Sequence, residues 1–257
     1  MFYKQIGLCI LSATLLIACA GAPSTPDDVR ALRAAEVNTR LGIQYLRSGE
    51  YDMSRKRLEK AIHLAPGYAG AHDAIAVLYE RVGERTLAEK HYLKSLRLDP
   101  DNASSRNNYG QFLCQSKRYS EAEDAFMQAA NNPFYRTPWV PLTNAGICYM
   151  GVPDNEQAEK YLRQALQQQP EYAPALLKMG MLSFAAGNYL ATRAYMQRFQ
   201  QVADHTPESL WLAVRAEFAL KDHQAWGNYA FQLKNKFPDS EQTLLLQEWE
   251  NERRSGN

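Results

Sequence analysis

Apolar and small residues return at a fixed interval along most of this chain. One position recurs in six successive segments, at steps of 34, 34, 36, 34 and 34 residues: Gly42, Ala76, Gly110, Gly146, Gly180 and Val214. In the clearest segments an aromatic residue follows three positions later, as Tyr45, Tyr79 and Tyr149 do. Residues three apart share one face of a helix. Each segment is therefore predicted to hold a first helix and a second helix that packs against it.

A proline closes several of these units, as Pro66, Pro100 and Pro170 show. Proline lacks an amide proton and restricts the residue before it, so the second helix ends there. This pattern resembles the tetratricopeptide repeat, which implies an all-α, right-handed superhelical solenoid. We place six repeats within 25–240, at 35–68, 69–102, 103–138, 139–172, 173–206 and 207–240. A helical bundle is the alternative, but nothing in a bundle maintains a 34-residue step.

Departures from the period predict local features. The third segment carries two extra residues, so Asn131–Pro138 should form a longer turn. Ser240–Arg254 reads as one last helix, capped by Ser240, within a capping helix and tail at 241–257. Its inward-facing residues are expected to be Leu244, Leu245 and Trp249.

The amino terminus has the features of an export signal. Lys4 precedes an apolar run, Ile6–Ile17, that is shorter than the about 20 residues a membrane-spanning helix needs. The run ends in a segment, Leu16–Cys19, that resembles the bacterial lipobox, with a signal peptide at 1–18 and a lipid on Cys19. An ordinary secretory signal that contains cysteine is the alternative. Ala20 is not the aspartate associated with inner-membrane retention, which favours the outer membrane, facing the periplasm.

A strong helix start follows the acylated residue closely. Thr25, Pro26, Asp27 and Asp28 offer a capping hydroxyl, a first-turn proline and two carboxylates at the positive end of the helix dipole. The lipidated tether is then 19–24, and its free part reaches less than about 20 Å. The first repeat is therefore expected close to the membrane surface.

Charge and motifs exclude several classes of function. The 29 basic and 28 acidic residues nearly cancel, and cleavage would remove Lys4, so nucleic acid is not expected as a partner. The chain lacks the nucleophile-elbow, phosphate-loop and dinucleotide motifs, and its five histidines are scattered. We therefore expect no catalytic residue, no metal and no cofactor, and so no enzyme.

Two cysteines, Cys114 and Cys148, remain once Cys9 leaves with the signal and Cys19 is acylated. In the repeat register they lie near the ends of the first helices of the third and fourth copies, which pack side by side. A disulfide between them would close a loop of about 35 residues and contribute about 3–4 kcal/mol. Two buried free thiols are the alternative.

The concave face of such a solenoid is the expected partner-binding groove. It is lined by the first helix of each repeat: Thr39, Ile43, Leu46, Asp73, Val77, Asn107, Asn108, Gln111, Asn144, Ile147, Met181 and Phe184. Asn108 and Asn144 hold equivalent positions, and their carboxamides are suited to the backbone of an extended peptide. The alternative is that these side chains pack between helices or are solvated. Basic residues that would clamp a terminal carboxylate are not expected to come together.

Taken together, the lipobox, short tether, repeats, terminal helix and cysteine placement resemble the type IV pilus biogenesis lipoproteins PilF and PilW. This resemblance implies a pilotin, an outer-membrane lipoprotein that binds the secretin subunit and promotes its localisation and multimerisation. We expect the protein to be monomeric by itself. The alternative is a repeat lipoprotein that serves as an adaptor for peptidoglycan enzymes or another envelope assembly complex.

Overall fold

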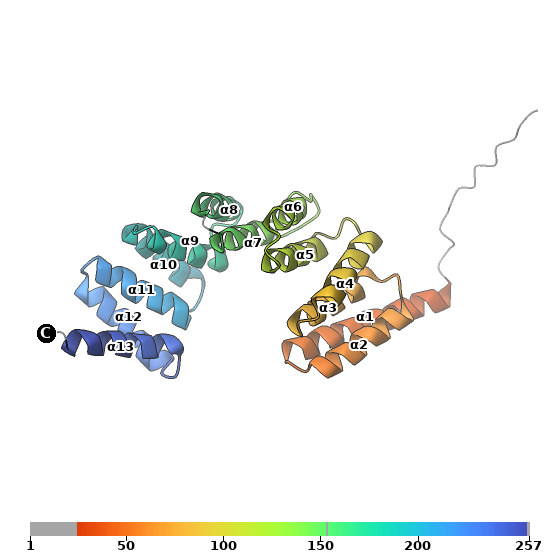
Figure 1. The fold of residues 1–257 in the computed structure, drawn as a ribbon, viewed down its shortest axis with the longest axis horizontal. Coiled ribbons are helices and arrows are strands. Elements are labelled where there is room, and N and C mark those ends of the chain that lie inside the picture. The colour runs from red at the N-terminus through yellow and green to blue at the C-terminus, as the bar shows by residue number, and fades with distance from the viewer. Residues whose placement is uncertain (1–24, 153, 256–257) are drawn as a thin grey trace, which may run out of the picture.

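The computed structural model describes residues 25–152 and 154–255. Within these ranges the chain forms thirteen helices and no strand (Figure 1). Their bounds are α1 Pro26–Arg47, α2 Tyr51–Leu64, α3 Ala69–Arg81, α4 Arg85–Leu98, α5 Ala103–Gln115, α6 Tyr119–Ala130, α7 Trp139–Met150, α8 Asn155–Gln168, α9 Ala173–Ala185, α10 Tyr189–Val202, α11 Pro207–Ala219, α12 His223–Lys236 and α13 Glu241–Ser255. The all-α solenoid predicted from the period is confirmed.

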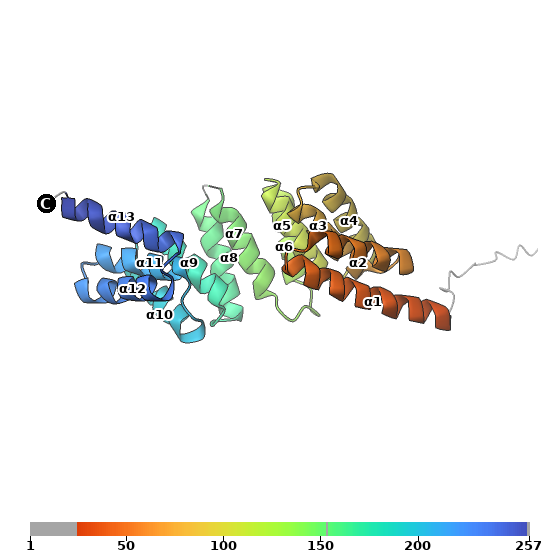
Figure 2. The same cartoon turned by 90° about the horizontal axis from the view of Figure 1, so that it is seen from below.

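Consecutive helices pair into hairpins, and the hairpins follow one another along the long axis of the molecule (Figures 1 and 2). The odd-numbered helices α1 to α13 also contact one another in sequence. Within the described ranges, the second helices of neighbouring hairpins make no such contact. Because the first helices of neighbouring hairpins pack against one another and the second helices do not, the stack curves into an arch. In Figure 1, α5 and α7 lie on its inner side and α6 and α8 on its outer side.

The recurring small residues are the points where paired helices approach most closely. A Cβ on Gly42 would lie 2.6 Å from Leu58 Cγ, and one on Gly146 would lie 2.6 Å from Leu162 Cγ. Both leucines are fully buried. A larger residue at these glycines would push the two helices apart. The period of small residues in the sequence therefore marks the recurring contact between paired helices.

A left-handed residue ends the first helix of several hairpins. Gly49, Gly83 and Gly187 have φ values of 76°, 83° and 74°, and Lys117 and Lys221 have φ values of 60°. Glycine adopts this region without penalty, whereas a residue with a Cβ does so at some cost. Each of these residues lies two positions before the second helix of its hairpin, where the chain reverses direction. The same turn therefore recurs in register with the repeats.

The longer turn predicted over Asn131–Pro138 is present, since α6 ends at Ala130 and α7 begins at Trp139. The predicted inward face of the last helix is only partly right. Leu244 and Leu245 are 54% and 40% exposed, while Leu246 is fully buried. The helix is rotated from the expected position because Thr243 turns inward and donates a hydrogen bond to the Phe237 carbonyl at 2.8 Å.

Trp249 does pack inward, with its ring 4.6 Å from that of Phe218 and nearly perpendicular to it. Ser240 caps the helix by accepting from the Thr243 amide at 3.2 Å. The last helix therefore covers the open end of the preceding hairpin, in the place of the expected capping helix.

At the other end, α1 begins with the predicted cap. The Thr25 hydroxyl accepts from the Asp28 amide at 3.2 Å, and the Asp28 carboxylate accepts from the Thr25 amide at 2.9 Å. The Thr25 amide and the Thr25 hydroxyl both donate to the Asp28 carboxylate, and these two bonds lower the Asp28 pKa. The lipobox, Cys19 and the tether lie outside the described residues. Among the helices that are described, none has the length and hydropathy needed to cross a bilayer.

Candidate functional site

A groove lies at the amino-terminal end of the arch, between α1, α3 and α5. It consists of two adjoining pockets that share Val77, Arg81 and Asn108. The first pocket, of about 600 Å³, is lined by Ile43, Leu46, Arg47, Gly49, Tyr51, Asp73, Ala74, Val77, Arg81 and Asn108. The second, of about 440 Å³, is lined by Val77, Glu80, Arg81, Tyr92, Asn108, Gln111 and Gln115. We call the two together the groove, and Ile43, Leu46 and Val77 its apolar wall.

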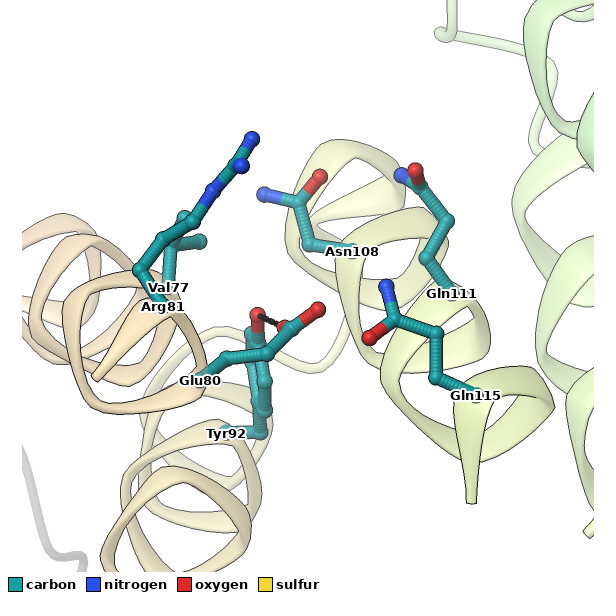
Figure 3. Close-up of a pocket in the computed structure, with 7 residues that line it drawn as sticks. All are labelled: Val77, Glu80, Arg81, Tyr92, Asn108, Gln111 and Gln115. Atoms are coloured by element: carbon teal, nitrogen blue, oxygen red, sulfur yellow. Dashed lines mark hydrogen bonds between the residues drawn. The ribbon is translucent and has the colours of Figure 1, made fainter. Parts of the chain in front are cut away.

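The second pocket is mainly polar (Figure 3). Three carboxamides from α5, those of Asn108, Gln111 and Gln115, project into it opposite side chains of α3. Its base is fixed, because the buried Tyr92 hydroxyl donates to Glu80 at 2.7 Å. Burial and the Glu80 carboxylate raise the Tyr92 pKa, so this hydroxyl keeps its proton. The pocket thus offers amide donors and acceptors on a rigid support.

Asp73 is the buried acidic group of the first pocket. Its Oδ2 accepts from Asn108 Nδ2 at 3.0 Å. Its Oδ1 is buried and has no hydrogen-bond partner among the described residues. Burial raises the Asp73 pKa to about 6, and the bond from Asn108 opposes this effect. The Asp73 carboxylate is therefore held within the fold beneath the groove surface.

Asn108 and Asn144, the two asparagines expected to bind a peptide backbone, also bond within the fold. Asn108 donates to Asp73, and Asn144 Nδ2 donates to Asn107 Oδ1 at 2.9 Å. Each bond connects the first helix of one hairpin to that of the hairpin before it. The equivalence of the two asparagines thus produces a pair of inter-repeat bonds, and only their remaining donors and acceptors are available to a ligand.

The structure gathers half of the expected groove residues into this site: Ile43, Leu46, Asp73, Val77, Asn108 and Gln111. Two others do not line it. Thr39 is buried, with its hydroxyl bonded to the Ala35 carbonyl at 2.9 Å, and Asn107 is buried beneath Asn144. These two positions lie on the side of the helix that faces the next helix and not the solvent, so their assignment to the groove was wrong.

The remaining expected residues lie further along the arch, on α7 and α9. Ile147 and Met181 are 38% and 36% exposed. Phe184 is half-buried, and the Arg215 guanidinium lies 4.6 Å from its ring centre. These side chains, with Asn144, do not contribute to the two pockets of the groove.

Two arginines of the groove were not predicted from the sequence. Arg47 and Arg81 end α1 and α3 and line the same pocket. The expectation that basic residues would not come together is therefore wrong for this pair. Their signal is visible in the sequence, since they are 34 residues apart and so hold one position of the repeat.

Cys114 and Cys148 are joined by a disulfide, with their Cα atoms 5.8 Å apart. The bond links α5 to α7 on the inner side of the arch (Figure 1). Beside it, the Tyr149 and Tyr161 hydroxyls both donate to the Glu123 carboxylate. The middle hairpins are therefore connected by a covalent bond and by a shared acceptor.

Two histidines, His72 and His91, pack against each other and bond within the fold. His72 Nδ1 lies 2.9 Å from His91 Nδ1, and His72 Nε2 lies 3.1 Å from the Pro66 carbonyl. If His72 donates to that carbonyl through Nε2, His91 is the donor between the two rings. Burial and the neighbouring ring lower the His91 pKa to about 4. Residues 25–152 and 154–255 contain no cluster of three or more His, Cys, Asp or Glu that could hold a metal ion.

Comparison with known proteins identifies the repeats. Models of the tetratricopeptide repeat family match residues 71–104 and 91–124. The type IV pilus assembly protein PilF of Pseudomonas aeruginosa is 30% identical over 220 residues, which cover 86% of each chain.

Solved structures give the same result. The structure of Pseudomonas aeruginosa PilF superposes with a TM-score of 0.71 at 29% identity, covering 85% of this chain and 98% of that one. The structure of PilW, described as a widely conserved type IV pilus biogenesis factor, has a TM-score of 0.73 at 29% identity, covering 82% and 97%. The chain therefore belongs to the PilF and PilW family of tetratricopeptide-repeat proteins of type IV pilus biogenesis.

Proposed function

We propose that this protein is a pilotin, anchored in the outer membrane by a lipid on Cys19 and binding the secretin subunit of the type IV pilus system. The observation that carries the proposal is the relationship to PilF and PilW over most of the chain. Tetratricopeptide-repeat proteins of this kind generally act as non-enzymatic scaffolds or adaptors. The protein promotes multimerisation of the secretin at the outer membrane without a catalytic step.

The groove is the part of the described surface best suited to a protein partner. It combines an apolar wall with carboxamides and two guanidinium groups. Such a surface buries apolar side chains of an extended segment while bonding to its backbone. The inter-repeat bonds and the disulfide hold the neighbouring helices in place, so little ordering is needed when a partner binds.

Anchoring and binding together account for assembly. Each subunit held at a membrane meets its neighbours at a high effective concentration, so weak contacts between subunits suffice to close a ring. Several acyl chains provide durable attachment, since each buried methylene contributes about 0.8 kcal/mol, whereas one chain is marginal.

The test is to follow heat-stable secretin multimers in cells. Deletion of the gene should lower the multimers in the outer-membrane fraction, and the wild-type gene should restore them. The Cys19→Ala variant should retain binding to secretin in pull-downs while multimers leave the outer membrane. Unchanged outer-membrane multimers in the deletion strain would exclude the proposal.

A further inference from the structure

The charged groups of the groove define the chemistry of its partner. Arg47 and Arg81 occupy the last turns of α1 and α3, at equivalent positions of successive hairpins. Both are exposed, and both line the pocket that contains the apolar wall. The groove also contains two carboxylates, and these accept hydrogen bonds from neutral groups, Asp73 from Asn108 and Glu80 from Tyr92.

Neither guanidinium is neutralised within the described structure. No ion pair there involves Arg47 or Arg81, whereas Arg118, Arg163 and Arg193 are each paired with carboxylates. Asp73 lies in the same pocket, yet its carboxylate bonds to Asn108 and not to either arginine. The pocket thus leaves two planar donor groups available to an incoming acceptor.

The shape of the groove favours an extended chain that passes through it. The first pocket continues past Arg81 and Asn108 into the second, where Gln111 and Gln115 follow along α5 (Figure 3). The carboxamides match the amides and carbonyls of a peptide backbone. A segment that continues on both sides of the arginines brings a side chain to them, and not a chain end.

We propose that Arg47 and Arg81 jointly bind one acidic side chain on an extended segment of the protein partner. An apolar side chain of the same segment packs against the apolar wall, and its backbone bonds to the carboxamides of α5. This inference rests on the proposed function, in which the partner is the secretin, and adds the kind of segment that the groove selects.

The test compares two charge-reversal variants of the full protein. The groove variant, Arg47→Glu with Arg81→Glu, reverses the charge of both arginines in the groove. The control variant, Arg33→Glu with Arg97→Glu, makes the same change in charge at exposed arginines outside the groove. Circular dichroism verifies that both variants fold. The groove variant should bind the periplasmic part of the secretin at least about tenfold more weakly, while the control stays within about twofold of wild type.

Overlapping peptides from the secretin then identify the acidic residue. The peptide that binds should contain Asp or Glu beside an apolar residue, and changing that acid to Lys should abolish binding to wild type. The same Lys peptide should bind the groove variant, because the charges of both partners are exchanged. Amidation of the peptide terminus should have no effect. Loss of binding on amidation would assign the arginines to a terminal carboxylate and overturn the proposal.

The outcomes separate this proposal from the proposed function. If wild type and the groove variant bind secretin equally well, the role of the arginines is wrong although the pilotin function stands. If wild type does not bind secretin, the proposed function fails. A positional-scanning peptide library then tests the groove by itself, where a preference for Asp or Glu at one position supports the inference and no preference overturns it.

Discussion

Glycine at a helix contact determines how closely two helices of a hairpin can approach. At Gly146, a Cβ would lie 2.6 Å from Leu162 Cγ and 3.1 Å from the Ala158 carbonyl. Neither the buried leucine nor the backbone oxygen can move easily. At Gly180 the near atom is Met196 Cε, at 2.7 Å, the end of a flexible side chain. The same position in the repeat therefore tolerates a methyl group to different degrees.

Gly146→Ala is expected to lower the free energy of unfolding by about 1–2 kcal/mol. Overpacking costs about 1–3 kcal/mol, and the better helix propensity of alanine offsets up to about 1 kcal/mol of it. Gly227→Ala in α12 is the control, because nothing lies within 4 Å of its Cβ position, and it should stabilise by about 0.5–1 kcal/mol. Urea unfolding measures both, and a Gly146→Ala variant as stable as wild type would contradict the packing argument.

At the scale of the helices, the disulfide between α5 and α7 connects the two hairpins around the longer turn Asn131–Pro138. The two cysteines are 34 residues apart, two fewer than the step from Gly110 to Gly146, so Cys148 lies two positions earlier in its repeat than Cys114 does. The bond spans the one step at which the repeat interval lengthens to 36 residues. It compensates for an irregular connection by fixing the helices on either side of it.

The double variant Cys114→Ala/Cys148→Ala should lose about 3–4 kcal/mol of stability on the chain-entropy model. Urea unfolding of the purified protein in oxidising buffer measures this difference. Reductant should lower the stability of wild type by a similar amount and leave the double variant unchanged. A wild-type protein whose unfolding is insensitive to reductant would show that the bond does not stabilise the fold.

The sequence predicts helix pairing well because pairing depends on local spacing. The 34-residue step follows from contacts such as Gly42 with Leu58, which lie within one hairpin. The cap at Thr25 and the longer turn were equally local and could be predicted. The orientation of α13 could not, since Leu246 and Thr243 turn inward to meet α12 in a contact that no repeat specifies.

The groove was harder to predict for a similar reason. Projection onto one helix face found Ile43 and Val77, but Thr39, one turn before Ile43 on that face, is buried. Arg47 was missed because it lies in the last turn of α1, next to the projected position Leu46, and it lines the pocket together with Arg81 of the next repeat. Such cross-repeat neighbours are found by comparing equivalent positions, and not by reading one helix at a time.

At the scale of the whole molecule, the groove and the last helix lie at opposite ends of the arch. The groove is built from α1, α3 and α5, and α13 ends the stack at the carboxyl terminus (Figures 1 and 2). If the proposed lipid is on Cys19, the tether before Thr25 reaches less than about 20 Å. The proposed anchor therefore places the partner-binding end of the solenoid beside the membrane, where a secretin subunit would assemble.

This orientation can be measured with a fluorophore on one introduced cysteine, because the native pair is already bonded. Arg33→Cys in α1 and Gln247→Cys in α13 are both exposed positions. In vesicles that contain the lipidated protein and a spin-labelled lipid, the label at position 33 should be quenched more strongly than the label at position 247, because quenching requires close approach. Unlipidated Cys19→Ala protein provides the baseline for each label. Equal quenching at both positions would mean that the arch lies along the membrane. Stronger quenching at position 247 would mean that the carboxyl-terminal end, and not the groove end, lies near the lipid.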